Sequence, residues 1–282
     1  MDKASVQAAF VTAGLTRVTK DIDALTKASI RLLTTPVAET TLELGASKLG
    51  GVPDLPTATS WPIWKDIPQS FIAQIRLADV HQYDVNGVLP GQGMLWFFYD
   101  AQQQTYGADP MDKGGWAVLF AETPGTLERT PAPATLPPAS QFRACALTYT
   151  SELTLALQPQ LELAPFDWTD EEQQRYETLL ASFPTPEDHA AVHNRLLGNP
   201  EMLQDDMRSQ CQLVSHGVTD ASDPKAAELA PGTMDWQLLF QVDSDEQAGM
   251  RWASTGLLYY WLRKVDLQAR NFAASWLVLQ SE

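Results

Sequence analysis

Short apolar runs, rich in aromatic and branched residues, recur along the chain without the spacing of a helix. Runs that lack a helical period favour strands that are buried on both faces or nearly so. We expect each of two sets to form a three-stranded antiparallel meander within one sheet system. The first set comprises residues 71–79, 93–100 and 116–120. The second set comprises residues 238–245, 256–262 and 276–280.

Both sets follow the same internal order. The first run carries a central glutamine, Gln74 in one set and Gln241 in the other. The second run begins with a glycine, Gly93 or Gly256, and the third begins with a tryptophan. Because several features recur in one order, the pattern indicates an internal duplication.

Helical patterns fill the segment between the two sets. A capping box formed by Thr169 and Glu172 begins a predicted helix that runs to Phe183. Cap residues followed by a terminal glycine predict two more helices, at 185–198 and at 199–217. This segment is therefore expected to be mostly helical.

The two remaining segments give weaker patterns. Residues 3–33 predict one or two helices, although the sequence SIRLL at 29–33 also fits a strand. Alternation of polar and apolar residues at 147–157 predicts one or two strands.

The predicted fold class is α+β, with duplicated antiparallel β-meander units forming a sheet system, a helical acidic insertion between them and an N-terminal helix. The chain is treated as a single domain, 1–282. Its first pseudo-repeat spans about 40–157, its helical insertion about 165–230, and its second pseudo-repeat about 235–282.

The net charge of −16 is concentrated in one segment. Residues 158–250 hold 4 basic and 18 acidic residues, a net charge of −14. Such a field repels nucleic acid and anionic membranes, so neither is an expected partner. It favours a basic protein partner, or else it simply keeps the protein soluble.

The chain contains no apolar run approaching the roughly 20 residues that a membrane-spanning helix needs. The N-terminal sequence MDKASVQAAFVTAGL lacks the long apolar core of a signal peptide. We therefore expect a cytoplasmic protein with no membrane partner.

The repeated glutamines are the first candidates for a binding site. Strand alternation places Gln74 beside Arg76 and Gln241 beside Asp243, on the less apolar face of each strand. Each amide either ties down the backbone of a neighbouring loop or lines a groove between the two units that holds a small molecule. His193 completes the set of candidate ligand-binding residues, although an imidazole near a helix end also serves to bond a loop carbonyl.

Established catalytic and metal-binding motifs do not emerge from the sequence. It has neither a phosphate-binding glycine loop nor a G-x-S-x-G elbow. The i,i+4 pair His189 and His193 has no glutamate between its members, unlike a zinc-protease helix. Cys145 and Cys211 fit small buried thiols. No catalytic residue, metal or cofactor is therefore predicted.

Several motifs in one order resemble the YwqG-like family, a bacterial domain of unknown function. The resemblance covers about 25–282 and implies a duplicated α+β fold without an established reaction. Some relatives are thought to lie near bacterial toxin systems, so the resemblance also raises an immunity-like role. The matching stretches are SKLGGVPDLPTATSWPIWKDIPQSFIAQIRLAD, LPGQGMLWFFYD, HNRLLGNPEMLQDDM, WQLLFQVDSD and GLLYYWL.

The chain departs from that family before its aromatic strand. The family usually has a Trp-Gly-Asp-x-Gly stretch there, whereas this chain has Trp252, Ala253, Ser254, Thr255 and Gly256. The missing acid argues against any reaction that would depend on it.

Three functions follow from these patterns. The first is a non-catalytic intracellular binding protein whose acidic face meets a basic protein partner, in an immunity-like role. The second is a small-ligand binder that uses the groove between the repeats. The third is a hydrolase built on acids such as Asp109, Asp112 and Asp243.

Overall fold

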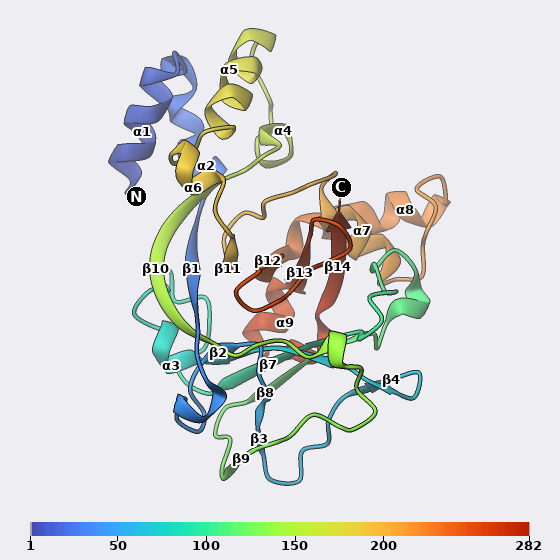
Figure 1. Ribbon diagram of the computed structural model, residues 1–282. Helices are drawn as coiled ribbons and strands as arrows, with labels where there is room; N and C mark the ends of the chain where they lie inside the picture. The colour runs from blue at the N-terminus through green and yellow to red at the C-terminus, as the bar shows by residue number, and fades with distance from the viewer. Residues whose placement is uncertain (1, 282) are drawn as a thin grey trace.

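A ten-stranded antiparallel sheet organises the computed structural model, which describes residues 2–281 (Figure 1). Neighbouring strands of this sheet pair antiparallel throughout. In spatial order the strands are β14 (Trp276–Ser281), β13 (Gly256–Arg263), β12 (Trp236–Asp243), β11 (Asn194–Leu197), β1 (Thr26–Pro36), β10 (Cys145–Leu155), β2 (Lys48–Leu49), β6 (Ser70–Arg76), β7 (Met94–Tyr99) and β8 (Trp116–Ala121).

The two predicted meanders lie at opposite ends of this sheet. Strands β6, β7 and β8 form one meander, and β12, β13 and β14 form the other. The four strands between them are β11, β1, β10 and β2, of which β1 and β10 are paired along eleven residues each. The α+β class is confirmed, and both meanders belong to one nearly closed sheet.

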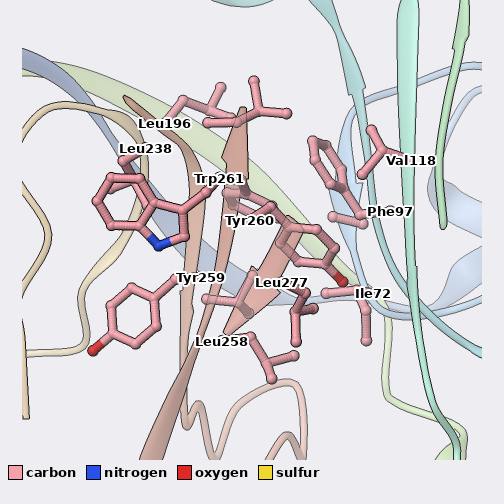
Figure 2. Close-up of a cluster of buried hydrophobic side chains, with 14 of the residues drawn as sticks. Ile72, Phe97, Val118, Leu196, Leu238, Leu258, Tyr259, Tyr260, Trp261 and Leu277 are labelled. Carbon is pink, nitrogen blue, oxygen red and sulfur yellow. The ribbon is translucent and has the colours of Figure 1, made fainter. Parts of the chain in front are cut away.

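The main core lies where the inner faces of the two meanders meet. Phe97 of β7 packs against Phe240 of β12 with ring centroids 4.7 Å apart, and against Tyr260 of β13 at 5.2 Å. Figure 2 shows Tyr260 and Phe97 side by side in this core, with Ile72 and Leu277 close to them. The large aromatic residues of both sets thus fill one shared interior.

Aromatic contacts also join the two ends of the sheet. Trp116 of β8 and Trp276 of β14 meet edge to face with centroids 5.0 Å apart. The Trp116 indole N–H donates to the Ser275 carbonyl at 2.9 Å, and the Trp276 indole N–H donates to the Gly107 carbonyl at 2.9 Å. These bonds hold the sheet close to a closed ring.

The loop between β7 and β8 covers the outer edge of β14. Its Tyr106 carbonyl accepts a hydrogen bond from the Leu279 N–H at 3.4 Å. Gly107 has φ +72, and a Cβ atom there would lie 1.9 Å from the Leu277 carbonyl oxygen. Only glycine allows the loop backbone to approach the strand this closely.

The N-terminal helices and α5 build a second, smaller core at one end of the sheet (Figure 1). The elements are α1 (Lys3–Thr12), a 3₁₀ helix (Thr16–Asp21), α2 (Ile22–Leu25) and α5 (Asp170–Leu180). The predicted capping box at Thr169 and Glu172 is present, and Tyr176 is the buried residue of α5. The chain leaves α2 directly into β1, so the strand interpretation of SIRLL is confirmed.

Two of the predicted helices are wrong in their extent. The segment 185–198 forms only α6 (Pro186–His189), and Asn194–Leu197 then pairs as β11 between β1 and β12. Its four residues are all buried, so tertiary pairing outweighs the local helical pattern. The segment 199–217 is helical only at α7 (Met207–Val214), with an N-cap at Asp206. The expected helical insertion therefore contributes a strand to the main sheet.

Shorter elements complete the fold. A two-stranded sheet pairs β3 with β9 and another pairs β4 with β5. No helix within residues 2–281 is long and apolar enough to cross a membrane. The remaining strands and helices are β3 (Asp54–Pro56), β4 (Ile63–Trp64), β5 (Ile67–Pro68), β9 (Leu127–Arg129), α3 (Leu77–Val80), α4 (Pro159–Glu162), α8 (Pro224–Leu229) and α9 (Lys264–Gln268). Further 3₁₀ turns lie at Glu39–Thr41, Pro110–Asp112, Pro138–Ser140, Ala230–Asp235 and Phe272–Ala274.

Candidate functional site

Gln74 and Gln241 are fully buried, and each holds the backbone of a loop. The Gln74 amide donates to the Ala46 carbonyl at 2.8 Å and accepts from the Asp54 N–H at 2.7 Å. The Gln241 amide donates to the His193 carbonyl at 2.8 Å and accepts from the Glu201 N–H at 2.9 Å. In both cases the two bonded loop residues are eight positions apart.

Each loop is held a second time by an aromatic side chain from the next strand. Trp96 pairs with Gln74 across β6 and β7, and its indole N–H donates to the Asp54 carbonyl at 2.9 Å. Tyr259 pairs with Gln241 across β12 and β13, and its hydroxyl donates to the Glu201 carbonyl. The loop-anchoring interpretation of the glutamines therefore agrees with their bonds.

The structure does not bring the candidate groove residues into one set of contacts. Gln74 and Arg76 belong to the first meander, where the exposed Arg76 side chain pairs with Asp79 at 2.8 Å. Gln241 and Asp243 belong to the second meander, at the other end of the sheet. Since each glutamine lies under its own loop, no pocket described for residues 2–281 has both in its walls.

Three of the predicted ligand-binding residues, His193, Gln241 and Asp243, are joined by hydrogen bonds. His193 donates its backbone N–H to Asp243 Oδ2 at 2.8 Å and gives its carbonyl to the Gln241 amide. Burial raises the pKa of Asp243, although its hydrogen bonds from backbone groups oppose that shift. The strand β11 that follows His193 thus anchors these three residues at one place.

Each loop also carries a basic residue and an acid six positions apart. In the first, the fully buried Lys48 lies 3.4 Å from Asp54 and 2.6 Å from Glu39. Arg129 completes this cluster by donating from Nε to Asp54 Oδ1 at 2.8 Å. Every charged group of the cluster has a hydrogen-bonded partner, so we read it as structural.

The second cluster is less completely paired. The Arg195 Nε atom lies 3.3 Å from Glu152, and its Nη2 atom lies 3.8 Å from Glu201. Arg31 reaches this place from β1, with Nη1 3.5 Å from Glu152 and 3.9 Å from Asp188. Both guanidinium groups are almost fully buried, with 8% and 4% of the side chain exposed.

Several polar atoms of this cluster lack a hydrogen bond. Arg31 Nε and Nη1, Arg195 Nε and Glu201 Oε2 are all buried without a hydrogen-bond partner. Only the Nη atoms of the two arginines donate, to the carbonyls of Val192 and Asn199. Leaving a buried polar atom unsatisfied costs about 1–3 kcal/mol, so native proteins keep few of them without a reason.

His193 is neutral at pH 7. Burial, together with the charges of Arg195 and Arg31, lowers the pKa of His193 to about 3. Its Nε2–H donates to the Asp188 carbonyl at 2.9 Å, because a carbonyl oxygen only accepts. Nδ1 is then an acceptor, and it contacts Glu201 Oε2. Both ring nitrogens are thus occupied, as the interpretation of His193 as a structural imidazole expects.

A pocket opens beside the second cluster. Its charged wall contains Arg195, His193 and Glu152, and its volume is about 70 Å³. Its apolar wall includes Leu180 and Phe183, which come from α5 and the turn after it. This combination of a buried charged wall and an apolar wall is typical of a small-molecule site. We call it the Arg195 pocket.

Sequence reasoning missed Arg31, Arg195, Glu152 and Glu201. Arg31 and Glu152 belong to strands that are far from β11 in sequence, so only the pairing of the sheet brings them together. The available signal was the spacing of Arg195 and Glu201, which repeats that of Lys48 and Asp54.

The acids considered for hydrolysis have structural partners. Asp109 caps a 3₁₀ turn by accepting from the Met111 N–H, and Asp112 accepts from the Tyr106 and Gly107 N–H groups. Asp243 accepts from the His193 N–H at 2.8 Å. Within the described part of the chain, no group of three His, Cys, Asp or Glu side chains is arranged to hold a metal ion.

The two cysteines are free and buried, as predicted. Burial raises the pKa of Cys145 to about 11 and raises that of Cys211 well above its ordinary value. Neither thiol is therefore an activated nucleophile.

Comparison with known proteins identifies one family. No curated protein matches the chain. A family model described as a domain of unknown function matches residues 47–281, which include both meanders and the residues that line the Arg195 pocket. The chain therefore belongs to the family Domain of unknown function (DUF1963).

Proposed function

We propose that this protein binds a small molecule in the Arg195 pocket and does not transform it. The observation that carries the proposal is the buried guanidinium group of Arg195 in the wall of this pocket. Its Nε atom makes no hydrogen bond, and Glu152 and Glu201 meet the group only as ion pairs at 3.3 Å and 3.8 Å. A ligand that supplied a better-placed acceptor would satisfy the Arg195 Nε atom and remove the cost of leaving it without a hydrogen bond.

The walls of the pocket favour a ligand with two different ends. A carboxylate is the acceptor that guanidinium groups bind best, because two parallel N–H donors match its two oxygen atoms. The side chains of Leu155, Leu180 and Phe183 provide an apolar surface for the rest of the molecule. We therefore expect a small carboxylate with an aliphatic or aromatic body.

The state of His193 supports binding over catalysis. Its Nε2 is bonded to the Asp188 carbonyl, and its Nδ1 is in contact with Glu201. A general base must reach the proton that it removes. Since both nitrogens already have partners, the imidazole serves to position Glu201 and the β11 backbone.

Replacing Arg195 by methionine is expected to weaken binding of such carboxylates by about 10–100-fold, since a charged hydrogen bond contributes about 1.5–3 kcal/mol. Isothermal titration calorimetry with benzoate, hexanoate and phenylacetate would measure this, with benzyl alcohol as the uncharged comparison. Arg76→Met is the matched control, because Arg76 is exposed and lies outside the pocket. Binding that is equal in the Arg195→Met protein, or no binding of any carboxylate to the unaltered protein, would refute the proposal.

We also propose, as predicted from the sequence, that the two meanders and their loops arose by duplication. The matching bonds of Gln74 and Gln241, eight-residue loop spans and aromatic anchors support this. The YwqG-like subgroup, with its bacterial origin, stays a proposal that rests on the quoted motifs. On this view, the first copy kept a fully hydrogen-bonded cluster around Asp54, whereas the cluster around Arg195 in the second copy came to bind a ligand.

A basic protein partner, bound in the cytoplasm in an immunity-like role, is the second candidate. Asp170, Glu171 and Glu177 are exposed on α5, although Glu171 also pairs with Arg175. Opposite charge accelerates association and makes it sensitive to salt. We expect the immobilised chain to retain a basic protein at low salt and to release it at high salt. Changing all three acids to their amides should also abolish this retention. Retention that does not depend on salt would contradict this candidate.

A further inference from the structure

Two adjoining hollows lie beyond the turn that begins at Gly198. They share a wall formed by Lys27, Glu162, Arg208 and Gln237. The hollow that Trp261 lines has a volume of about 30 Å³, and the other has a volume of about 270 Å³. The Arg195 pocket has none of these four side chains in its walls. The hollows therefore form a separate site, which we call the Lys27 hollow.

A tryptophan without a hydrogen-bond partner lines this hollow. Seven tryptophans are buried in the described chain, and the indole N–H groups of six of them donate hydrogen bonds. Trp261 is the seventh: it is 2% exposed, and its Nε1 has no acceptor. Figure 2 shows its indole on the side of β13 away from Tyr260 and Phe97. Trp261 belongs to the edge of the main core and also lines the smaller hollow.

The acids around the hollow already have partners. Glu162 accepts from Arg208 Nη1 at 2.6 Å, and Asp206 accepts from Arg208 Nε at 2.9 Å. Asp84 accepts from the Leu89 N–H at 2.7 Å. These carboxylates are therefore part of the framework and do not compete for a new donor.

The lysines around the hollow are less well neutralised. Lys27 Nζ lies 3.6 Å from Glu162, which is longer than a normal hydrogen bond, and Lys264 Nζ donates only to the Met234 carbonyl at 3.0 Å. Burial lowers the pKa of Lys27, and the charges of Arg208 and Lys264 lower it further, against the opposing charge of Glu162. Three cations thus repel one another in one place, in a protein with a net charge of −16.

We infer that the Lys27 hollow binds a small oxyanion, a phosphate or carboxylate group, between the Lys27 ammonium and the Trp261 indole N–H. The anion accepts from the one buried indole that otherwise has no acceptor, and it offsets the mutual repulsion of Lys27, Arg208 and Lys264. The inference is independent of the ligand proposed for the Arg195 pocket, because the two sites use different donors.

Calorimetric titration of the full chain with inorganic phosphate and with pyrophosphate, in a chloride background, tests the inference. We expect saturable binding that weakens about 10-fold in Trp261→Phe, which keeps the ring and removes the N–H, and at least as much in Lys27→Met. Lys65→Met, at an exposed position on the β4–β5 turn, should bind like the unaltered protein. Arg195→Met should also keep full affinity for the anion.

Fluorescence gives a second readout that does not depend on stability. Phosphate should change the tryptophan emission of the unaltered protein and leave that of Trp261→Phe unchanged. The inference is overturned if neither anion binds at millimolar concentration, or if Lys27→Met and Trp261→Phe bind as tightly as Lys65→Met. Loss of anion binding in Arg195→Met would also overturn it, because the anion would then occupy the other pocket.

Discussion

Alanine in place of Phe97 is expected to lower the free energy of unfolding by about 3–5 kcal/mol, the usual cost of removing a buried aromatic ring. Phe97 is fully buried and contacts Phe240 and Tyr260 of the other meander. Its loss would leave a cavity at the place where the two ends of the sheet share their core. Equilibrium denaturation in guanidinium chloride measures the change.

The control for this experiment is Leu33→Ala, because 45% of Leu33 is exposed and its truncation should change stability by less than about 0.5 kcal/mol. The double variant with Phe240→Ala adds a sharper test, since contacting residues are not additive. A loss below about 1 kcal/mol for Phe97→Ala, or strict additivity in the double variant, would show that the meanders do not share a tightly packed interior.

Replacing Asp54 by asparagine is expected to cost about 3–5 kcal/mol, because removing one charge from a buried ion cluster leaves the others uncompensated. Asp54 is fully buried and accepts from Gly45, Gln74 and Arg129. Burial alone would raise the pKa of Asp54, but these hydrogen bonds and the charge of Lys48 outweigh it and lower the pKa.

The lowered pKa of Asp54 makes the stability cost of Asp54→Asn depend on pH. Because the folded-state pKa of Asp54 lies below the unfolded value of about 3.9, its contribution is complete at neutral pH and disappears as the pH falls through the folded-state value. The difference in unfolding free energy between the unaltered protein and Asp54→Asn should therefore narrow in acid. Asp66→Asn, at an exposed position, should differ little from the unaltered protein at any pH. A penalty for Asp54→Asn that is as small as that of the control would contradict the structural interpretation of this cluster.

The parts of the fold that the sequence predicts best are those set by local pattern. The aromatic runs of β7 and β13 and the capping box of α5 each specify their own structure over a few residues. β11 was missed because its four residues carry a helix-like pattern, and only two neighbouring strands from distant parts of the chain make it extended. A local pattern contains no information about such partners.

The residues of the candidate site could also be predicted only where a local pattern marks them. The unusual glutamines could be found because a polar residue in an apolar strand is conspicuous, and Gln241 does lead to Asp243 and His193. Arg31 gave no such signal, since one arginine in a short amphipathic stretch fits a helix surface equally well. Its burial beside Arg195 depends on the pairing of β1 with β11. The incompletely hydrogen-bonded Arg195 guanidinium, which carries the proposed function, therefore appears only in three dimensions.

The loop that lies over β14 has a consequence for the behaviour of the protein at high concentration. An uncovered outer strand is a template on which another molecule can extend the sheet, which leads to aggregation or domain swapping. Here the backbone of Tyr106 and Gly107 occupies that position, and a side chain at Gly107 would push it away from Leu277. This glycine thus protects the molecule from self-association as well as shaping its loop.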